Sequence, residues 1–300
     1  MSEKYIGIAL GSTYCRIGDL HYNLAQIADF ADQAREARSH ALLTPELSVT
    51  GYGPYPEVVA LAEKAGEGPA YEGLAAIAKK SGVILVAGFV ERHDHGPGIS
   101  HYVVFPGGEF LVQRKIRVTP FESPLVSINP AFPPGRDVPE KLDFGLLNFP
   151  TFEIQGLKCA VVICADFGIE RLHDYFDTLG VRVVFMASGA GGNVNERVRV
   201  CDLLTPEGLE KYRGVFEKAF FPKPADFMTS VTHRRAVVGL NQTGWDGRKC
   251  SHIGDGGIIT PRGEMAAFLY GMHNLDFQRP AFSAGRIPVE HFEPFHGGLA

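Results

Sequence analysis

Short apolar runs of strand length alternate with amphipathic helical segments, and this alternation is the feature that most constrains the fold. Residues 4–10, the run that ends at Pro45, and the run VILVAGFVE each have the length and apolar character of a buried strand. Between them, Asp19 can cap a helix whose apolar residues recur every three or four positions, and residues 69–81 begin with proline and end before a glycine. Strands separated by helices predict an α/β protein.

Tight turns between apolar runs add hairpins to this pattern. They are Pro106-Gly107-Gly108, Gln155-Gly156 and Pro261-Arg262-Gly263. Strands joined by such turns pair antiparallel, whereas strands joined through helices can pair parallel. Mixed sheets are therefore expected. A strand over residues 181–188 and a polar helical stretch at about 195–220 follow the second hairpin.

The composition excludes several classes of partner. The chain has 29 basic and 34 acidic side chains, a net charge of −5, which provides no electrostatic footprint for nucleic acid or an anionic membrane. No apolar run approaches the roughly 18–20 residues of a membrane-spanning helix. The N-terminal sequence MSEKYIGIALGS lacks the pattern of a signal peptide. We expect a cytoplasmic protein with one continuous domain over residues 1–300.

One of the cysteines stands out by its position in the sequence. The chain has five, scattered and without a Cys-x-x-Cys pair, which predicts neither a disulfide framework nor a zinc site. Cys164 ends the apolar run AVVIC where a helix is expected to begin. Backbone N–H groups and the helix dipole at such a junction favour a thiolate and can receive an oxyanion. A buried structural cysteine is the more common interpretation of this local pattern.

Two charged residues also lie at expected strand positions. Glu46 follows the run that ends at Pro45, at the carboxyl end of a strand, where α/β proteins favour ligand sites. Lys115 lies within a predicted strand over 110–118. Taken singly, a solvated loop glutamate and an edge-strand lysine are the ordinary interpretations.

Taken together, these residues and their flanks resemble the nitrilase (carbon–nitrogen hydrolase) superfamily, over roughly residues 4 to 270. Five segments in register carry the resemblance: 44–52, 113–116, 162–170, 235–244 and 256–264. The resemblance implies a four-layer α-β-β-α sandwich of two mixed sheets. It also implies a homodimer or higher homo-oligomer.

The resemblance further implies a catalytic triad of Glu46, Lys115 and Cys164. Cys164 would be the nucleophile and Glu46 the general base, while Lys115 and the backbone N–H of Ala165 would stabilise the oxyanion. Glu122 corresponds to a second family glutamate, although it follows Lys115 by one residue fewer than expected. No metal or other cofactor is implied.

Ser188 opens the glycine-rich loop 188–193, which matches neither the dinucleotide fingerprint nor the P-loop. We expect this loop, with Ser188, to border a substrate pocket near Cys164. The histidines show no metal-ligand spacing. A stretch at about 195–230 makes the interval after Cys164 longer than usual, and we expect an insertion there that covers the pocket or contacts a second subunit.

The implied reaction is hydrolysis of a small-molecule carboxamide to a carboxylate and ammonia. Ala165-Asp166 stands where nitrilases commonly have Trp-Glu, which favours an amide over a nitrile. Phe167 and Gly168 stand where N-carbamoyl amino acid hydrolases have arginine suited to a carboxylate. A nitrilase or N-carbamoyl amide hydrolase remains an alternative, and so does a catalytically silent binding protein of the same fold.

Overall fold

The computed structural model describes residues 4–129, 135, 142–189, 192–193, 205–219, 221–270 and 280–293. Two six-stranded sheets form its centre. Sheet A has the order β15 (Ala281–Pro288), β1 (Tyr5–Ser12), β2 (Ala41–Leu43), β3 (Ile84–His93), β4 (Gly96–Val104) and β5 (Phe110–Arg114). Strands β1, β2 and β3 are parallel to one another, and the remaining pairs are antiparallel.

Sheet B is mixed in the same way. Its order is β14 (Met265–Leu269), β13 (Gly256–Ile259), β10 (Ala236–Asn241), β8 (Val183–Ser188), β7 (Leu157–Ile163) and β6 (Thr151–Ile154). Strands β10, β8 and β7 are parallel, and the outer pairs are antiparallel. The hairpin turns and the helical crossovers therefore produce the mixed sheets that the sequence predicts.

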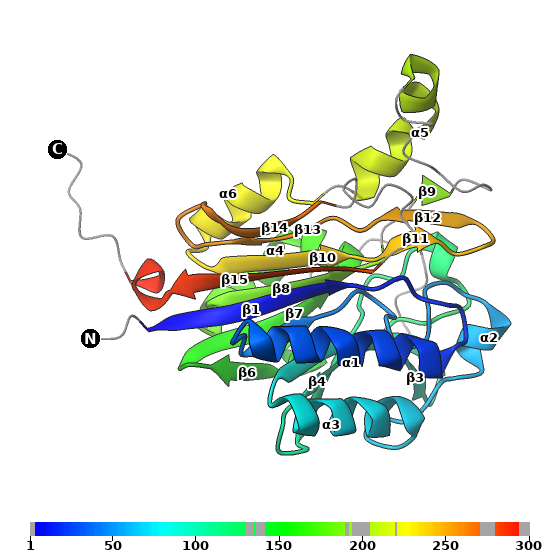
Figure 1. Cartoon of the computed structure of the whole chain (residues 1–300), viewed down its shortest axis with the longest axis horizontal. Coiled ribbons are helices and arrows are strands. Elements are labelled where there is room, and N and C mark those ends of the chain that lie inside the picture. Colours follow the sequence, from blue (N-terminus) through cyan, green and yellow to red (C-terminus); the bar gives the residue numbers. More distant parts are fainter. Residues whose placement is uncertain are drawn as a thin grey trace.

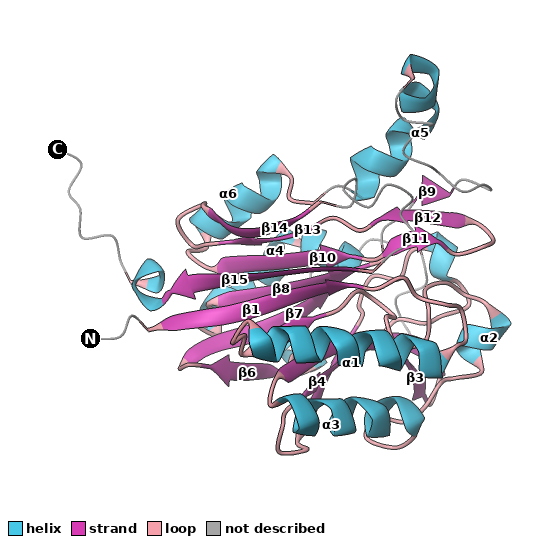
Figure 2. Ribbon diagram, in the orientation of Figure 1, coloured by secondary structure: helices cyan, strands magenta, loops and turns pink. Residues whose placement is uncertain are grey.

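Helices cover the outer face of each sheet (Figure 1, Figure 2). Helices α1 (Leu20–Glu36) and α3 (Pro69–Ser81) pack on sheet A, and α4 (Glu170–Thr178) and α6 (Pro224–Thr232) pack on sheet B. Alternate residues of one strand separate the layers: Ile8 of β1 lies in the core between the sheets, and Ala9 packs under the helices. This arrangement confirms the four-layer α-β-β-α sandwich.

The residues predicted to begin and end helices do so through contacts and backbone conformations in their immediate neighbourhood. The Asp19 side chain accepts a hydrogen bond from the N–H of Tyr22 at 3.0 Å and so caps α1. Gly82 ends α3 in the left-handed conformation with φ of 72°. The remaining short elements are α2 (Pro56–Val59) and the 3-10 turns η1 (Pro120–Glu122), η2 (Phe144–Leu147), η3 (Cys164–Gly168) and η6 (Val289–Phe292).

Three features differ from the sequence-based expectation. Strand β15 was not predicted; it pairs along all of β1, but its side chains are mostly half-buried and give no clear periodicity. The apolar run AVVGLNQTG, which predicts one strand over residues 236–244, is divided: β10 stays in sheet B, and β11 (Thr243–Trp245) joins a three-stranded sheet with β12 (Cys250–Ile253) and β9 (Gly192–Asn193). Strand β5 ends at Arg114, so Lys115 lies just beyond it.

The predicted insertion at about 195–230 is described in part. Residues 194–204 and 220 of the predicted helical stretch and insertion lie outside the described residues. Helix α5 (Pro206–Ala219) lies against β9 and β12 and extends away from the sheets in Figure 1. Helix α6 belongs to the layer over sheet B. A single domain over residues 1–300 stays a prediction. Within the described part of the chain, no helix has the length and apolar character needed to cross a bilayer.

Candidate active site

Three strand ends place the predicted residues at one location. Glu46 lies shortly after β2, and Lys115 directly follows β5, at the same edge of sheet A. Cys164 directly follows β7 in the facing sheet B. The site therefore lies between the carboxyl ends of strands from two sheets.

Lys115 contacts two carboxylates. Its Nζ lies 2.6 Å from Oε1 of Glu46 and 2.7 Å from Oε1 of Glu122, and all three side chains are wholly buried. Although the sequence interval between Lys115 and Glu122 is short, the side chain of Glu122 reaches Lys115 because η1 turns the chain back. The N–H of Glu122 bonds to the carbonyl of Thr119 at 3.0 Å, and the N–H of Thr119 bonds to Oε2 of Glu122 at 2.8 Å.

Further contacts orient the two glutamates. Oε2 of Glu46 accepts the backbone N–H of Gly189 at 2.9 Å, a bond that links the site to the chain after β8. The hydroxyl of Tyr52 donates to Oε1 of Glu122 at 2.7 Å. In the sequence, Tyr52 is only the last residue of the segment 44–52 that contains Glu46. Its hydroxyl contact depends on the fold, since 70 residues separate it from Glu122.

Cys164 has an unusual backbone conformation. Its φ is 49°, in the left-handed region, which costs a non-glycine residue roughly 1 kcal/mol or more. Unlike the glutamates and Lys115, it is partly exposed. Ser188 ends β8, next to β7, and its Oγ lies 3.5 Å from the Cys164 sulfur. Ala165 is the second residue of η3, where N–H groups have no partner within the turn.

Burial and neighbouring charges set the protonation of the site. Burial raises the pKa of Glu46 to about 7. Although Cys164 as a whole residue is half-buried, desolvation of its thiol, and then the charge of Glu46, raise the pKa of the thiol to about 12. Burial alone would lower the pKa of Lys115, but the carboxylates of Glu122 and Glu46 raise it well above its ordinary value. Near neutral pH the site therefore contains an ammonium group, a thiol and a carboxyl able to exchange a proton.

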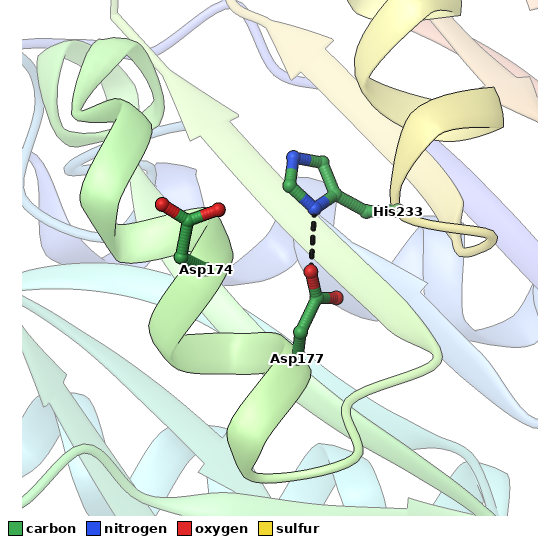
Figure 3. A group of neighbouring side chains, drawn as sticks. All are labelled: Asp174, Asp177 and His233. Atoms are coloured by element: carbon green, nitrogen blue, oxygen red, sulfur yellow. Dashed lines mark hydrogen bonds and ion pairs between the residues drawn. The ribbon is translucent and has the colours of Figure 1, made fainter.

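Asp174, Asp177 and His233 form a separate group whose ligand atoms lie within 4.8 Å of one another (Figure 3). Both aspartates are exposed on α4, and Nδ1 of His233 lies 2.7 Å from Asp177. The buried guanidinium of Arg235 also pairs with Asp177. Because a cation already neutralises this carboxylate, we assign the group to an ion-pair network.

A sequence model of the family described as "Carbon-nitrogen hydrolase" matches residues 8–197. The chain belongs to the carbon–nitrogen hydrolase family. A "Probable nitrilase C965.09" of Schizosaccharomyces pombe is 26% identical over 167 residues, which cover 53% of this chain and 55% of that protein. The match thus spans about half of the length of this curated relative.

Solved structures agree with the fold across nearly the whole chain. An amidase from Nesterenkonia sp. superposes with a TM-score of 0.70 at 20% identity, covering 97% of this chain and 94% of that one. A variant of the amidase from Nesterenkonia sp. AN1, with the acetamide moiety of fluoroacetamide covalently added at its active-site cysteine, gives a TM-score of 0.68 at 20% identity, covering 96% and 92%. These similarities confirm the predicted nitrilase-like fold.

Proposed function

We propose that this carbon–nitrogen hydrolase cleaves a small carboxamide into a carboxylate and ammonia through a thioester at Cys164. The observation that carries the proposal is the buried Glu46–Lys115–Glu122 cluster, with contacts of 2.6 and 2.7 Å, beside a partly exposed cysteine. An amide carbon is a poor electrophile, so its hydrolysis needs a nucleophile, a base and a stabilised oxyanion. The site contains a group for each.

The first half of the reaction forms the thioester. Glu46 removes the thiol proton as the sulfur of Cys164 attacks the carbonyl carbon. The negative charge that develops on the carbonyl oxygen is stabilised by the ammonium of Lys115 and the backbone N–H of Ala165. The carbon–nitrogen bond then breaks, and the proton held by Glu46 passes to the departing nitrogen, which leaves as ammonia.

The second half of the reaction restores the enzyme. Glu46 removes a proton from water, and the resulting hydroxide attacks the thioester carbon. Lys115 and the Ala165 N–H again stabilise the oxyanion. The carbon–sulfur bond breaks, the carboxylic acid leaves, and Cys164 recovers a proton from Glu46. Glu122 supports both halves by holding the Lys115 ammonium, and Ser188 borders the sulfur.

The amide preference rests on Ala165-Asp166 after the cysteine and on the amidases among the structural neighbours. The test is a panel of small amides, nitriles and ureido compounds, scored for ammonia release by the wild type and the Cys164→Ala variant. We expect the wild type to release ammonia from amides and the Cys164→Ala variant to release none. Preferential turnover of nitriles or ureido compounds would favour a nitrilase or carbamoyl hydrolase, and full activity of Cys164→Ala would reject the mechanism.

We also propose that the protein works in the cytoplasm as a homodimer or higher homo-oligomer. Met228 and Val231 of α6 are exposed apolar side chains, 65% and 48% accessible, and suit such a contact. For α5 we propose a role as a pocket cover or subunit contact. Both roles are tested by deleting the predicted insertion and then measuring the oligomer mass by light scattering and the substrate preference. An unchanged mass and an unchanged preference would reject them.

A further inference from the structure

One buried carboxylate connects the lysine segment to the cysteine segment. Asp166 lies two residues after Cys164 and is 1% exposed. Its Oδ2 accepts the backbone N–H of Ile116 at 2.9 Å, and its Oδ1 accepts that of Arg117 at 2.7 Å. Because Ile116 directly follows Lys115, this side chain forms a short bridge between the backbones that carry the ammonium and the thiol.

The two segments belong to different sheets. Lys115 follows β5 of sheet A, and Cys164 follows β7 of sheet B. The sheets meet through apolar side chains, and apolar contact is not directional. Hydrogen bonds, in contrast, fix both distance and direction. A displacement of about 1 Å between reacting groups can cost on the order of 10²-fold in rate.

Other bonds hold the lysine segment to sheet A and to the loop that follows it. The N–H of Lys115 donates to the carbonyl of Ile99 at 2.9 Å, and its carbonyl accepts the N–H of Ile128 at 3.0 Å. The hydroxyl of Ser127 donates to the carbonyl of Ile116 at 2.6 Å. Asp166 adds a connection to the opposite sheet.

We propose that Asp166 is a positioning residue whose carboxylate sets the distance between the Lys115 ammonium and the Cys164 sulfur. This inference rests on the proposed function, in which those two groups act on the same substrate. Each of the two N–H donors bonds to a different oxygen of the carboxylate. Asparagine has one acceptor oxygen and an NH₂ group, which would face the second N–H as a donor against a donor.

The chain contains a matched control for Asp166→Asn. Glu63 is also buried and also accepts two consecutive backbone N–H groups, those of Ala70 and Tyr71, each at 2.9 Å. It holds the first turn of α3 and lies outside the candidate site. Glu63→Gln makes the same chemical change in a bridge of purely structural character.

The test measures kcat, KM, thermal stability and the rate of Cys164 alkylation by iodoacetamide. We expect Asp166→Asn to lower kcat by about 10- to 100-fold with KM changed less than about threefold. Alkylation should also slow, because the Lys115 charge favours the thiolate. Glu63→Gln should lose stability while kcat and alkylation per folded molecule stay at wild-type values. Equal effects of the two variants on kcat and alkylation would overturn the proposal.

A second variant applies if Asp166→Asn does not fold. Asp166→Glu keeps the charge and both acceptor oxygens on a side chain one methylene longer, and is expected to lower kcat at least about tenfold. Wild-type kcat in that variant would overturn the proposal. If the wild type releases ammonia from no amide, the proposed function fails, and the alkylation comparison alone decides the role of Asp166.

Discussion

The ammonium of Lys115 lies 2.6 Å from the carboxylate of Glu46, and both side chains are wholly buried. The proposed general base is thus bonded to the proposed oxyanion donor. In this arrangement, proton transfer to Glu46 weakens its attraction for Lys115 while negative charge develops on the substrate oxygen. The ammonium can then interact more strongly with the oxyanion, which is the differential interaction that accelerates a reaction.

The pH dependence of amide hydrolysis should follow the ionisation of Glu46. Burial raises its pKa to about 7, and it must be ionised to accept the thiol proton. Activity should therefore fall as the pH decreases through about 7, well above the ordinary range of a glutamate. The measurement is kcat/KM for an amide across this range. An acid limb centred at the ordinary glutamate pKa of 4.5 would contradict the assignment.

Glu46→Gln should nearly abolish amide turnover and leave the fold intact. The amide of glutamine cannot accept the thiol proton, so we expect a loss of at least about 10²-fold in kcat/KM. Lys115 retains Glu122 as a partner at 2.7 Å, so no buried charge is left alone. Exposed Glu57→Gln is the control and should retain wild-type kinetics. Turnover by Glu46→Gln near the wild-type rate would exclude Glu46 as the base.

Lys115→Met should destabilise the protein strongly. The substitution leaves the buried carboxylates of Glu46 and Glu122 without their cation, and removing one partner of a buried ion pair costs about 3–5 kcal/mol. Urea unfolding measures the free energy of unfolding of this variant and of Glu46→Gln. We expect Lys115→Met to lose more of this free energy than Glu46→Gln, and the opposite order would argue against this charge arrangement.

Tyr52→Phe tests the contact that orients Glu122. The variant removes a single hydrogen bond of 2.7 Å, worth about 1 kcal/mol or somewhat more because its acceptor is a carboxylate. We expect kcat to fall by about 5- to 10-fold without loss of the fold. Tyr55→Phe, which removes the 2.6 Å bond to Asp246, is the matched control. Equal kcat values in the two variants would show that Tyr52 does not support the site.

Local signals explain which parts of the fold the sequence predicts. The Asp19 cap, the glycine after α3 and the hairpin turns act through neighbouring residues, so α1, α3 and the paired strands are recognisable. Strand β15 lacks such a signal, because it is defined by pairing with β1 nearly the whole chain length away. The division between β10 and β11 likewise depends on which sheet each part joins.

In the candidate site, too, contacts between residues far apart in the sequence could not be predicted from local signals. Glu46, Lys115 and Cys164 were found through their flanking motifs, and the structure brings them together with Glu122. Tyr52 and Asp166 lie within those motifs, but their partners are 70 and about 50 residues away in the sequence. The Asp166 contacts arise only because the two sheets face each other, and the Tyr52 contact joins two loops that follow separate strands of sheet A.

The most direct test of the central claim is to quench the enzyme during turnover of an amide and analyse its peptides by mass spectrometry. We predict an acyl adduct on the peptide that contains Cys164, formed during ammonia release and absent from Cys164→Ala. Ammonia release without any adduct at Cys164, together with wild-type activity of Cys164→Ala, would contradict the account.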